Sequence, residues 1–164
     1  MFNFSWIERV RQHHAIEHAT IHILSQRYPT IRLVGRSDLA GFYIYGSVST
    51  EAVRDAAQEA LRRLQAGENE LAVHPNCGTN LVTAGVLSGI ATWVATSGRK
   101  RSFWEQLPSA LSAALVATLL ARPLGYFAQE RITTQASVDN VRLRNVTTRG
   151  AWRLRVHRVI FDHS

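Results

Sequence analysis

The stretch Arg11-Gln12-His13-His14-Ala15-Ile16-Glu17-His18-Ala19-Thr20-Ile21-His22 decides how we expect the chain to fold. It places four of the chain's seven histidines in one predicted helix. On a helix that turns about 100° per residue, His14, His18 and His22 lie on one face, with Glu17 beside them. Apolar residues fall on the same side, so this face should be buried. Buried imidazole and carboxylate groups are costly unless they are partnered, so the stretch predicts a functional site.

Length and composition set the frame for this helix. The chain has 164 residues, of which 46% are hydrophobic and 19% are charged, so one folded domain with a small appendage is expected rather than disorder. Cys77 is the single cysteine, which excludes an intrachain disulfide. The formal net charge is +7, and the basic surplus lies after residue 78. The first residues are amphipathic and charged, unlike a signal peptide.

Periodicity and turn residues predict the elements of the N-terminal region. Ser5 and Glu8 match a capping box for a helix from Trp6 to about Gln26. Residues 31–35 and 41–46 read as two strands of a hairpin. Ser49 or Thr50 should cap a second helix that ends before Gly67, and residues 71–73 read as a short strand.

Two apolar runs follow. Residues 79–98 carry no charge, and neither do residues 107–121, which are extended by 124–128. About twenty helical residues cross a bilayer core, so we expect a transmembrane hairpin. The small residues of Gly85-x-x-x-Gly89 and of the second run suit close contact with partner helices or a second copy of the chain. The alternative is a buried hairpin in a soluble protein.

The C-terminal region alternates between apolar residues and arginine. Residues 141–144 and 152–157 predict a second β-hairpin with one apolar face and one arginine face. The arginine face would bind anionic lipid phosphates, and we expect no sequence-specific nucleic-acid partner. A solvated strand face is the alternative. The residues assigned to this face are Arg142, Arg144, Arg153 and Arg155.

The residues His14-Ala15-Ile16-Glu17-His18 match H-x-x-E-H, the motif of inverted zinc proteases. Histidines at i and i+4 can reach one Zn²⁺, and Glu17 would be the catalytic base for metal-bound water. The motif implies a zinc-dependent hydrolase, but the downstream glutamate ligand of inverzincins has no obvious counterpart here. The alternative is a buried hydrogen-bond network of the same side chains.

Zinc normally takes at least three protein ligands, so His14 and His18 need a third. We assign His74, because it ends the predicted strand 71–73 and Pro75 would fix its approach. The residues His74-Pro75-Asn76-Cys77-Gly78 also suit the start of a helix, which is the alternative. Further candidate ligands are His22, Cys77 and His157.

Four segments carry a resemblance to a known family: residues 11–20, 41–46, 64–68 and 74–80. They resemble an uncharacterised family of bacterial membrane proteins found in cyanobacteria and related phyla, described only as a domain of unknown function. The resemblance covers most of the chain. It implies a small α/β region, a hydrophobic pair of helices and a short tail, and it implies no established activity.

These observations predict an α+β protein. Residues 1–78 form an α/β region, residues 79–128 form the hydrophobic hairpin, and residues 129–164 complete the soluble domain. We expect a bacterial inner-membrane protein with a cytoplasmic domain. The basic loop 99–101 favours the opposite orientation, in which this loop is cytoplasmic and the domain is outside. Two functions stay open. The first is a membrane-anchored metalloprotein, with zinc-dependent hydrolysis as its expected activity. The second is a non-enzymatic membrane assembly or scaffold protein.

Overall fold

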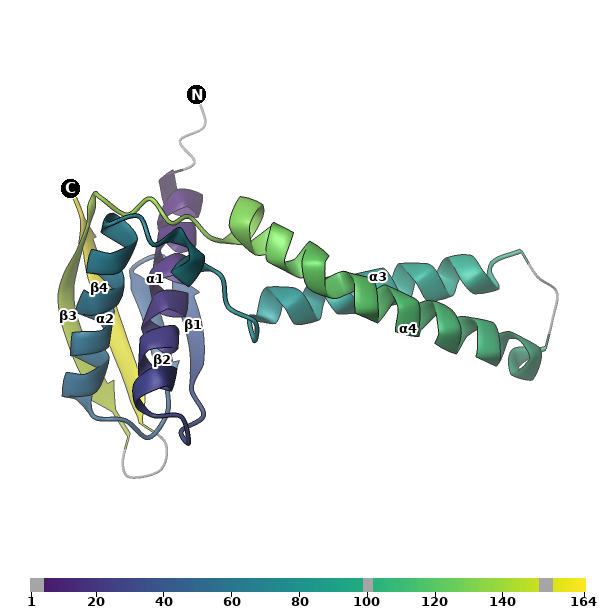
Figure 1. Ribbon diagram of the computed structural model, residues 1–164, viewed down its shortest axis with the longest axis horizontal. Coiled ribbons are helices and arrows are strands. Elements are labelled where there is room, and N and C mark those ends of the chain that lie inside the picture. Colours follow the sequence, from purple (N-terminus) through teal and green to yellow (C-terminus); the bar gives the residue numbers. More distant parts are fainter. Residues whose placement is uncertain (1–4, 99–101, 151–154) are drawn as a thin grey trace. The chain divides into compact units, whose positions relative to one another are not determined.

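The computed structural model describes residues 5–98, 102–150 and 155–164, and it is an α+β protein, as predicted (Figure 1). The chain divides into two compact units. The first comprises residues 1–74 and 130–164, and the second comprises residues 75–129. The elements in chain order are α1 (Ser5–Arg27), β1 (Val34–Asp38), β2 (Gly41–Tyr45), α2 (Thr50–Gln65), η1 (Asn69–Ala72), α3 (Gly78–Thr96), α4 (Phe103–Ala128), η2 (Gln129–Thr133), β3 (Val141–Arg149) and β4 (Val156–His163).

The first unit is a four-stranded antiparallel sheet in the order β1-β2-β4-β3, with α1 and α2 side by side on one face (Figure 1). Inward-facing side chains from adjacent strands meet beneath the helices. Phe42 lies opposite Val159 in the register, and both are fully buried. Ile16 and Leu24 of α1 are equally buried and belong to the same core. The buried face of α1 therefore lies against the sheet and against α2.

The first hairpin is confirmed, but its first strand is shifted. Residues 31–35 were expected to pair, whereas β1 begins at Val34 and ends at Asp38. The cause is local turn chemistry, because the Asp38 carboxylate accepts hydrogen bonds from the backbone N–H groups of Ala40 and Gly41. Asp38 and Gly41 are paired, so only two residues form the loop, and the strand starts later than periodicity suggested.

The second helix follows its predicted signals, whereas the short strand after it does not form. Ser49 is the N-cap of α2, and its hydroxyl accepts a hydrogen bond from Ala52 N–H. Residues 71–73 were predicted as a strand, but Asn69–Ala72 is the 3₁₀ turn η1. This turn packs on α1 instead of joining the sheet. Its last carbonyls are used by histidines of α1, as described below.

The second unit is a pair of antiparallel helices, α3 and α4, each long and apolar enough to cross a membrane. Ala117, Ala121 and Gly125 of α4 are buried, and small residues therefore line the contact of α4 with α3. Of the predicted small-residue face, Ala110, Ala113, Ala114 and Ala117, the last is buried there. The hydroxyls of Ser88 and Thr118 lie 2.9 Å apart across the contact. Gly85 and Gly89 have open space where a Cβ would point, so this pair faces away from α4.

The predicted C-terminal hairpin is present. β3 extends to Arg149, and β4 begins at Val156. Residues 152–154 of the predicted second strand, Arg153 among them, lie outside the described residues. A register shift between Leu143 and Asn145 marks an irregularity in β3. Such a bulge reverses which residues of a strand face outward, and simple alternation cannot show it.

Candidate functional site

Three histidines of α1 each hydrogen-bond a backbone carbonyl of another segment. The His14 Nδ1 lies 3.0 Å from the Thr133 carbonyl oxygen, and the His18 Nδ1 lies 2.7 Å from that of Ala72. The His22 Nε2 lies 2.9 Å from the Val73 carbonyl oxygen. The packing of η1 on α1 brings the carbonyls of residues 72 and 73 within hydrogen-bond distance of these imidazoles. The helical spacing of the imidazoles could therefore be predicted from the sequence, whereas their hydrogen-bond partners depend on the tertiary structure.

These contacts determine where each imidazole carries its proton. A carbonyl oxygen only accepts, so the ring nitrogen that faces it must donate. In the neutral imidazole the other nitrogen then has a lone pair, which is Nε2 in His14 and His18 and Nδ1 in His22. Metal-ligating histidines in proteins usually show this arrangement, with one nitrogen held by a carbonyl and the other on the metal.

His74 joins the three histidines of α1. Its ring centroid lies 4.7 Å from that of His22 and 5.8 Å from that of His18, and the centroids of His14 and His18 are 4.3 Å apart. We call these four residues the histidine ladder. Burial lowers the pKa of His74 to about 4, and the neighbouring His22 and His18 add to this effect. His74 is therefore neutral at physiological pH, the form in which imidazole binds metal ions.

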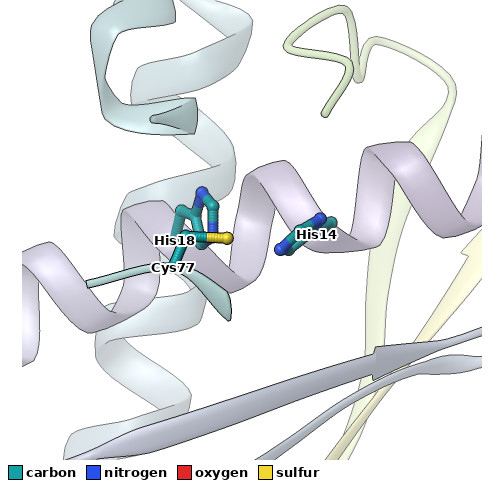
Figure 2. A group of neighbouring side chains, drawn as sticks. All are labelled: His14, His18 and Cys77. Atoms are coloured by element: carbon teal, nitrogen blue, oxygen red, sulfur yellow. The ribbon is translucent and has the colours of Figure 1, made fainter. Parts of the chain in front are cut away.

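Figure 2 shows His14 and His18 on successive turns of α1, together with Cys77. These three side chains offer one ligand atom each and could hold a metal ion. Cys77 is the N-cap residue of α3, and its sulfur accepts a hydrogen bond from Thr79 N–H. It follows His74 by three residues, so the covalent chain keeps its Cα within roughly 11 Å of that of His74.

Glu17 faces the sheet. The residue is 5% exposed, and Oε2 accepts a hydrogen bond of 2.5 Å from the Ser37 hydroxyl of β1. A Cβ on Gly35 would overlap the Glu17 carboxylate, so the absence of a side chain at Gly35 makes room for Glu17. Burial raises the pKa of Glu17, and the Ser37 hydrogen bond opposes that rise. The carboxylate thus ties α1 to β1.

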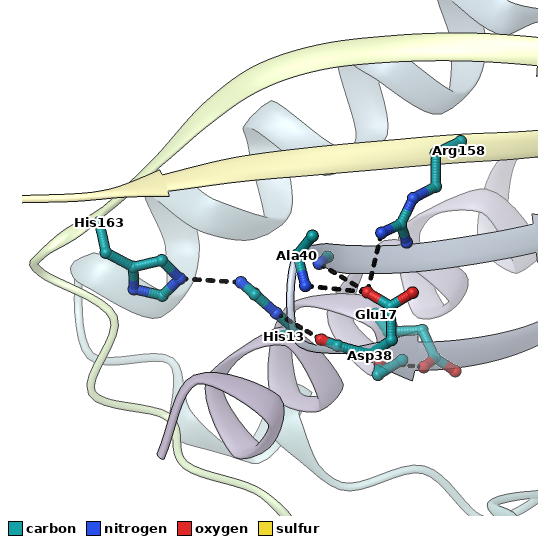
Figure 3. A network of polar contacts seen from close by, with 8 residues as sticks. His13, Glu17, Asp38, Ala40, Arg158 and His163 are labelled. Atoms are coloured by element: carbon teal, nitrogen blue, oxygen red, sulfur yellow. Dashed lines mark hydrogen bonds and ion pairs between the residues drawn. The ribbon is translucent and has the colours of Figure 1, made fainter. Parts of the chain in front are cut away.

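A second histidine pair lies on the sheet side of α1, as Figure 3 shows. The Nδ1 of buried His13 is 2.8 Å from the Asp38 carbonyl oxygen, and its Nε2 is 2.9 Å from Nε2 of His163. His13 therefore donates to Asp38 and accepts from His163. Asp38 also accepts a hydrogen bond of 2.8 Å from Arg158. The sequence analysis missed this pair, because the register that brings residue 163 to residue 13 leaves no local signal.

His157 has different neighbours from the ladder. It is fully buried on β4, and its Nδ1 lies 2.8 Å from the hydroxyl of Thr148 on β3. That hydroxyl is in turn 2.6 Å from the hydroxyl of Thr50, at the start of α2. Burial lowers the pKa of His157. These contacts support a structural role in the core for this candidate ligand.

The predicted arginine face is divided by the register. Arg142 and Arg144 are exposed on β3, and Arg144 forms an ion pair of 3.5 Å with Asp162. Arg155 precedes β4 at the other end of the hairpin, and its guanidinium donates to the Val48 carbonyl. The prediction that Arg155 shares a face with Arg142 is therefore wrong, and the cause is the register. Lipid binding by the exposed arginines stays a prediction.

The contact between Glu17 and Gly35 gives a test of its structural role. Gly35→Ala should lower the free energy of unfolding by about 1–3 kcal/mol, because the new methyl group overlaps the carboxylate. In a Glu17→Ala background the same substitution should cost much less, since the space is empty. Thermal unfolding of the four proteins measures the coupling. Additive effects of the two substitutions would show that Glu17 does not depend on Gly35.

Comparison with known proteins places the chain in a family without assigning it an activity. Residues 9–146 match the family described as Domain of unknown function (DUF6391). An uncharacterised protein of Picosynechococcus sp. (strain PCC 7002) is 40% identical in an alignment of 139 residues that covers 76% of this chain and 65% of that relative. The chain thus spans slightly less than two thirds of that relative's length. No solved structure matches. The chain belongs to the DUF6391 family, as the resemblance to an uncharacterised family predicted.

Proposed function

We propose that the protein is anchored in a membrane by α3 and α4 and binds a transition-metal ion on the histidine face of α1. His14 and His18 are the proposed helix ligands, through Nε2, and Cys77 is the third. The observation that carries the proposal is that one ligand atom from each of these three side chains lies within 4.8 Å of the other two. Imidazole and thiolate ligands together suit Zn²⁺ and other borderline ions.

The carbonyl hydrogen bonds orient two of the three ligands. His14 and His18 present Nδ1 to the carbonyls of Thr133 and Ala72, so Nε2 is the nitrogen of each ring that would reach an ion. One ligand atom from each of His14, His18 and Cys77 lies within 4.8 Å of the others, which suits a single bound ion.

The chain tether and the helix start support Cys77 as the third ligand. Three residues separate it from His74, whose ring adjoins His18 and His22. The N-terminus of α3, where Cys77 is the cap, favours a negative charge and hence the thiolate that metals bind. The three ligands leave room for a fourth, which is the usual arrangement of a zinc ion with an open position.

Hydrolysis is not part of this proposal. A general base must lie within hydrogen-bond reach of the water that it activates. The Glu17 carboxylate is engaged with Ser37 and packed over Gly35, which supports an anchoring role between α1 and β1. The proposed protein therefore binds, stores or delivers an ion at the membrane.

Metal analysis tests the site directly. Protein purified in detergent without a histidine tag should contain about one zinc or similar ion per chain. His18→Ala should lose the ion, because it removes the central ligand. Glu17→Gln should keep it, and so should His163→Ala, the matched control from the separate pair with His13. Metal-free protein whose thermal stability does not change on addition of zinc would refute the proposal.

Membrane extraction tests the anchor. The intact protein should sediment with membranes and resist alkaline carbonate, because α3 and α4 expose apolar side chains such as Val86 and Leu115. Replacing both with aspartate should release the protein, since a charge in a span costs about 2.5–3.5 kcal/mol on insertion scales. Aspartate at the exposed Val34 and Leu39 of the first unit is the matched control and should leave the protein in the membrane. A soluble, detergent-free monomer would contradict the anchor.

A further inference from the structure

The second unit has a cavity near the end of the hairpin where α3 begins. Its volume is about 410 Å³, which is within the range of ligand sites in proteins. All of its lining residues lie between positions 75 and 129, so the cavity belongs to that unit alone. Leu81, Ala84 and Ala121 give it apolar surface, and Arg122 gives it a positive charge.

The contacts of Asn80 hold the two sides of this cavity together. Its Nδ2 donates a hydrogen bond of 2.8 Å to the Pro75 carbonyl, and its Oδ1 accepts one of 2.7 Å from Nε2 of Gln129. A Cβ on Gly125 would overlap the Asn80 side chain, so glycine lets α4 approach α3 closely here. These contacts fix the start of α3 against the end of α4, and the cavity is therefore a preformed feature of the hairpin.

The hairpin offers Arg122 no nearby carboxylate. Glu105 is the only acidic residue in the sequence from 75 to 129, and it lies near the other end of α4, about 26 Å away by the helical rise. None of the ion pairs between described residues includes Arg122. A charged side chain in an apolar span is costly, and where it occurs it usually marks a functional contact. An anion from outside the chain would complete this one.

The length of α4 places Arg122 at the depth of lipid phosphates. Phe103 and Trp104 are exposed at the start of α4, and aromatic residues of this kind lie at a membrane interface. From Phe103 to Arg122 the helix rises about 30 Å, which is the thickness of the hydrocarbon core. With Phe103 at one boundary of the core, Arg122 lies at the other, beside the phosphates of that leaflet.

We propose that this cavity binds an anionic phospholipid, an inference that rests on the proposed membrane anchor. The Arg122 guanidinium holds the phosphate, because its fork of N–H donors matches phosphate oxygens. The apolar surface of Leu81 and Ala84 carries the start of one acyl chain. None of the described residues that line the cavity is acidic, so none pairs with the ammonium group of a zwitterionic headgroup. The cavity therefore favours lipids with a net negative charge.

Native mass spectrometry of the full-length protein in detergent measures lipid binding directly. The probe is dioleoyl-phosphatidylglycerol, and dioleoyl-phosphatidylcholine is the neutral comparison. The wild type should retain one phosphatidylglycerol in preference to phosphatidylcholine. Arg122→Gln should weaken phosphatidylglycerol binding at least roughly tenfold, which is the loss expected for one charge-assisted contact. Arg122→Lys keeps the charge and should lose less.

Two further variants locate the lipid. Ala84→Phe fills the apolar part of the cavity and keeps the cation, so it should also weaken phosphatidylglycerol binding. Arg142→Gln is the matched control, because it removes an exposed arginine from β3 of the first unit, and it should bind as the wild type does. Loss through Arg142→Gln but not through Arg122→Gln would assign the lipid to the β3 arginines and overturn the inference.

The remaining outcomes separate lipid from free phosphate and this inference from the proposed function. Thermal stabilisation by inorganic phosphate that depends on Arg122, without any by phosphatidylglycerol, would show a phosphate site and overturn the lipid. Arg122→Gln should keep its metal ion and stay in the membrane fraction. A wild type that keeps both but retains the two lipids equally would overturn this inference alone. A soluble, detergent-free monomer would overturn the anchor and this inference together.

Discussion

The constraint on which the structure depends is that His14, His18 and His22 of α1 each need a hydrogen-bond acceptor. Their acceptors come from the two chain segments that flank the apolar hairpin. His18 and His22 donate to Ala72 and Val73, just before the hairpin, and His14 donates to Thr133, just after it. Arg11 adds a hydrogen bond to the Thr134 carbonyl. The helix that carries the candidate ligands thus also holds the two segments of the first unit between which the hairpin is inserted in the sequence.

Much of this could be predicted from the sequence because it is encoded in local periodicity. The histidine face of α1, the capped helix after Ser49 and the two apolar helices are patterns within single elements. The rest depends on contacts between distant residues. Residues 71–73 look like a strand, yet they form η1 because their carbonyls serve α1. The irregularity near Leu143 and the contact of Arg155 with Val48 divided the predicted arginine face.

The H-x-x-E-H motif shows how one pattern can carry two separate roles. On the helix Glu17 lies beside His14 and His18, which favoured a catalytic base. In the fold, Glu17 is drawn to β1 by Ser37 and by the space above Gly35, so the carboxylate serves the contact between α1 and the sheet. The imidazoles of His14 and His18 instead contact the carbonyls of Thr133 and Ala72. The motif therefore identifies the residue types, whereas the contacts of Glu17 with the neighbouring strand β1 determine its role.

The central claim is that backbone carbonyls hold one ring nitrogen of each of His14, His18 and His22 as a hydrogen-bond donor. Long-range ¹⁵N–¹H correlation spectra of the metal-free protein at neutral pH report the tautomer of each ring. The structure predicts a proton on Nδ1 of His14 and His18 and on Nε2 of His22. Rings that exchange between tautomers, or His14 and His18 protonated on Nε2, would contradict it, because the lone pairs would then point at the carbonyls and not at an ion.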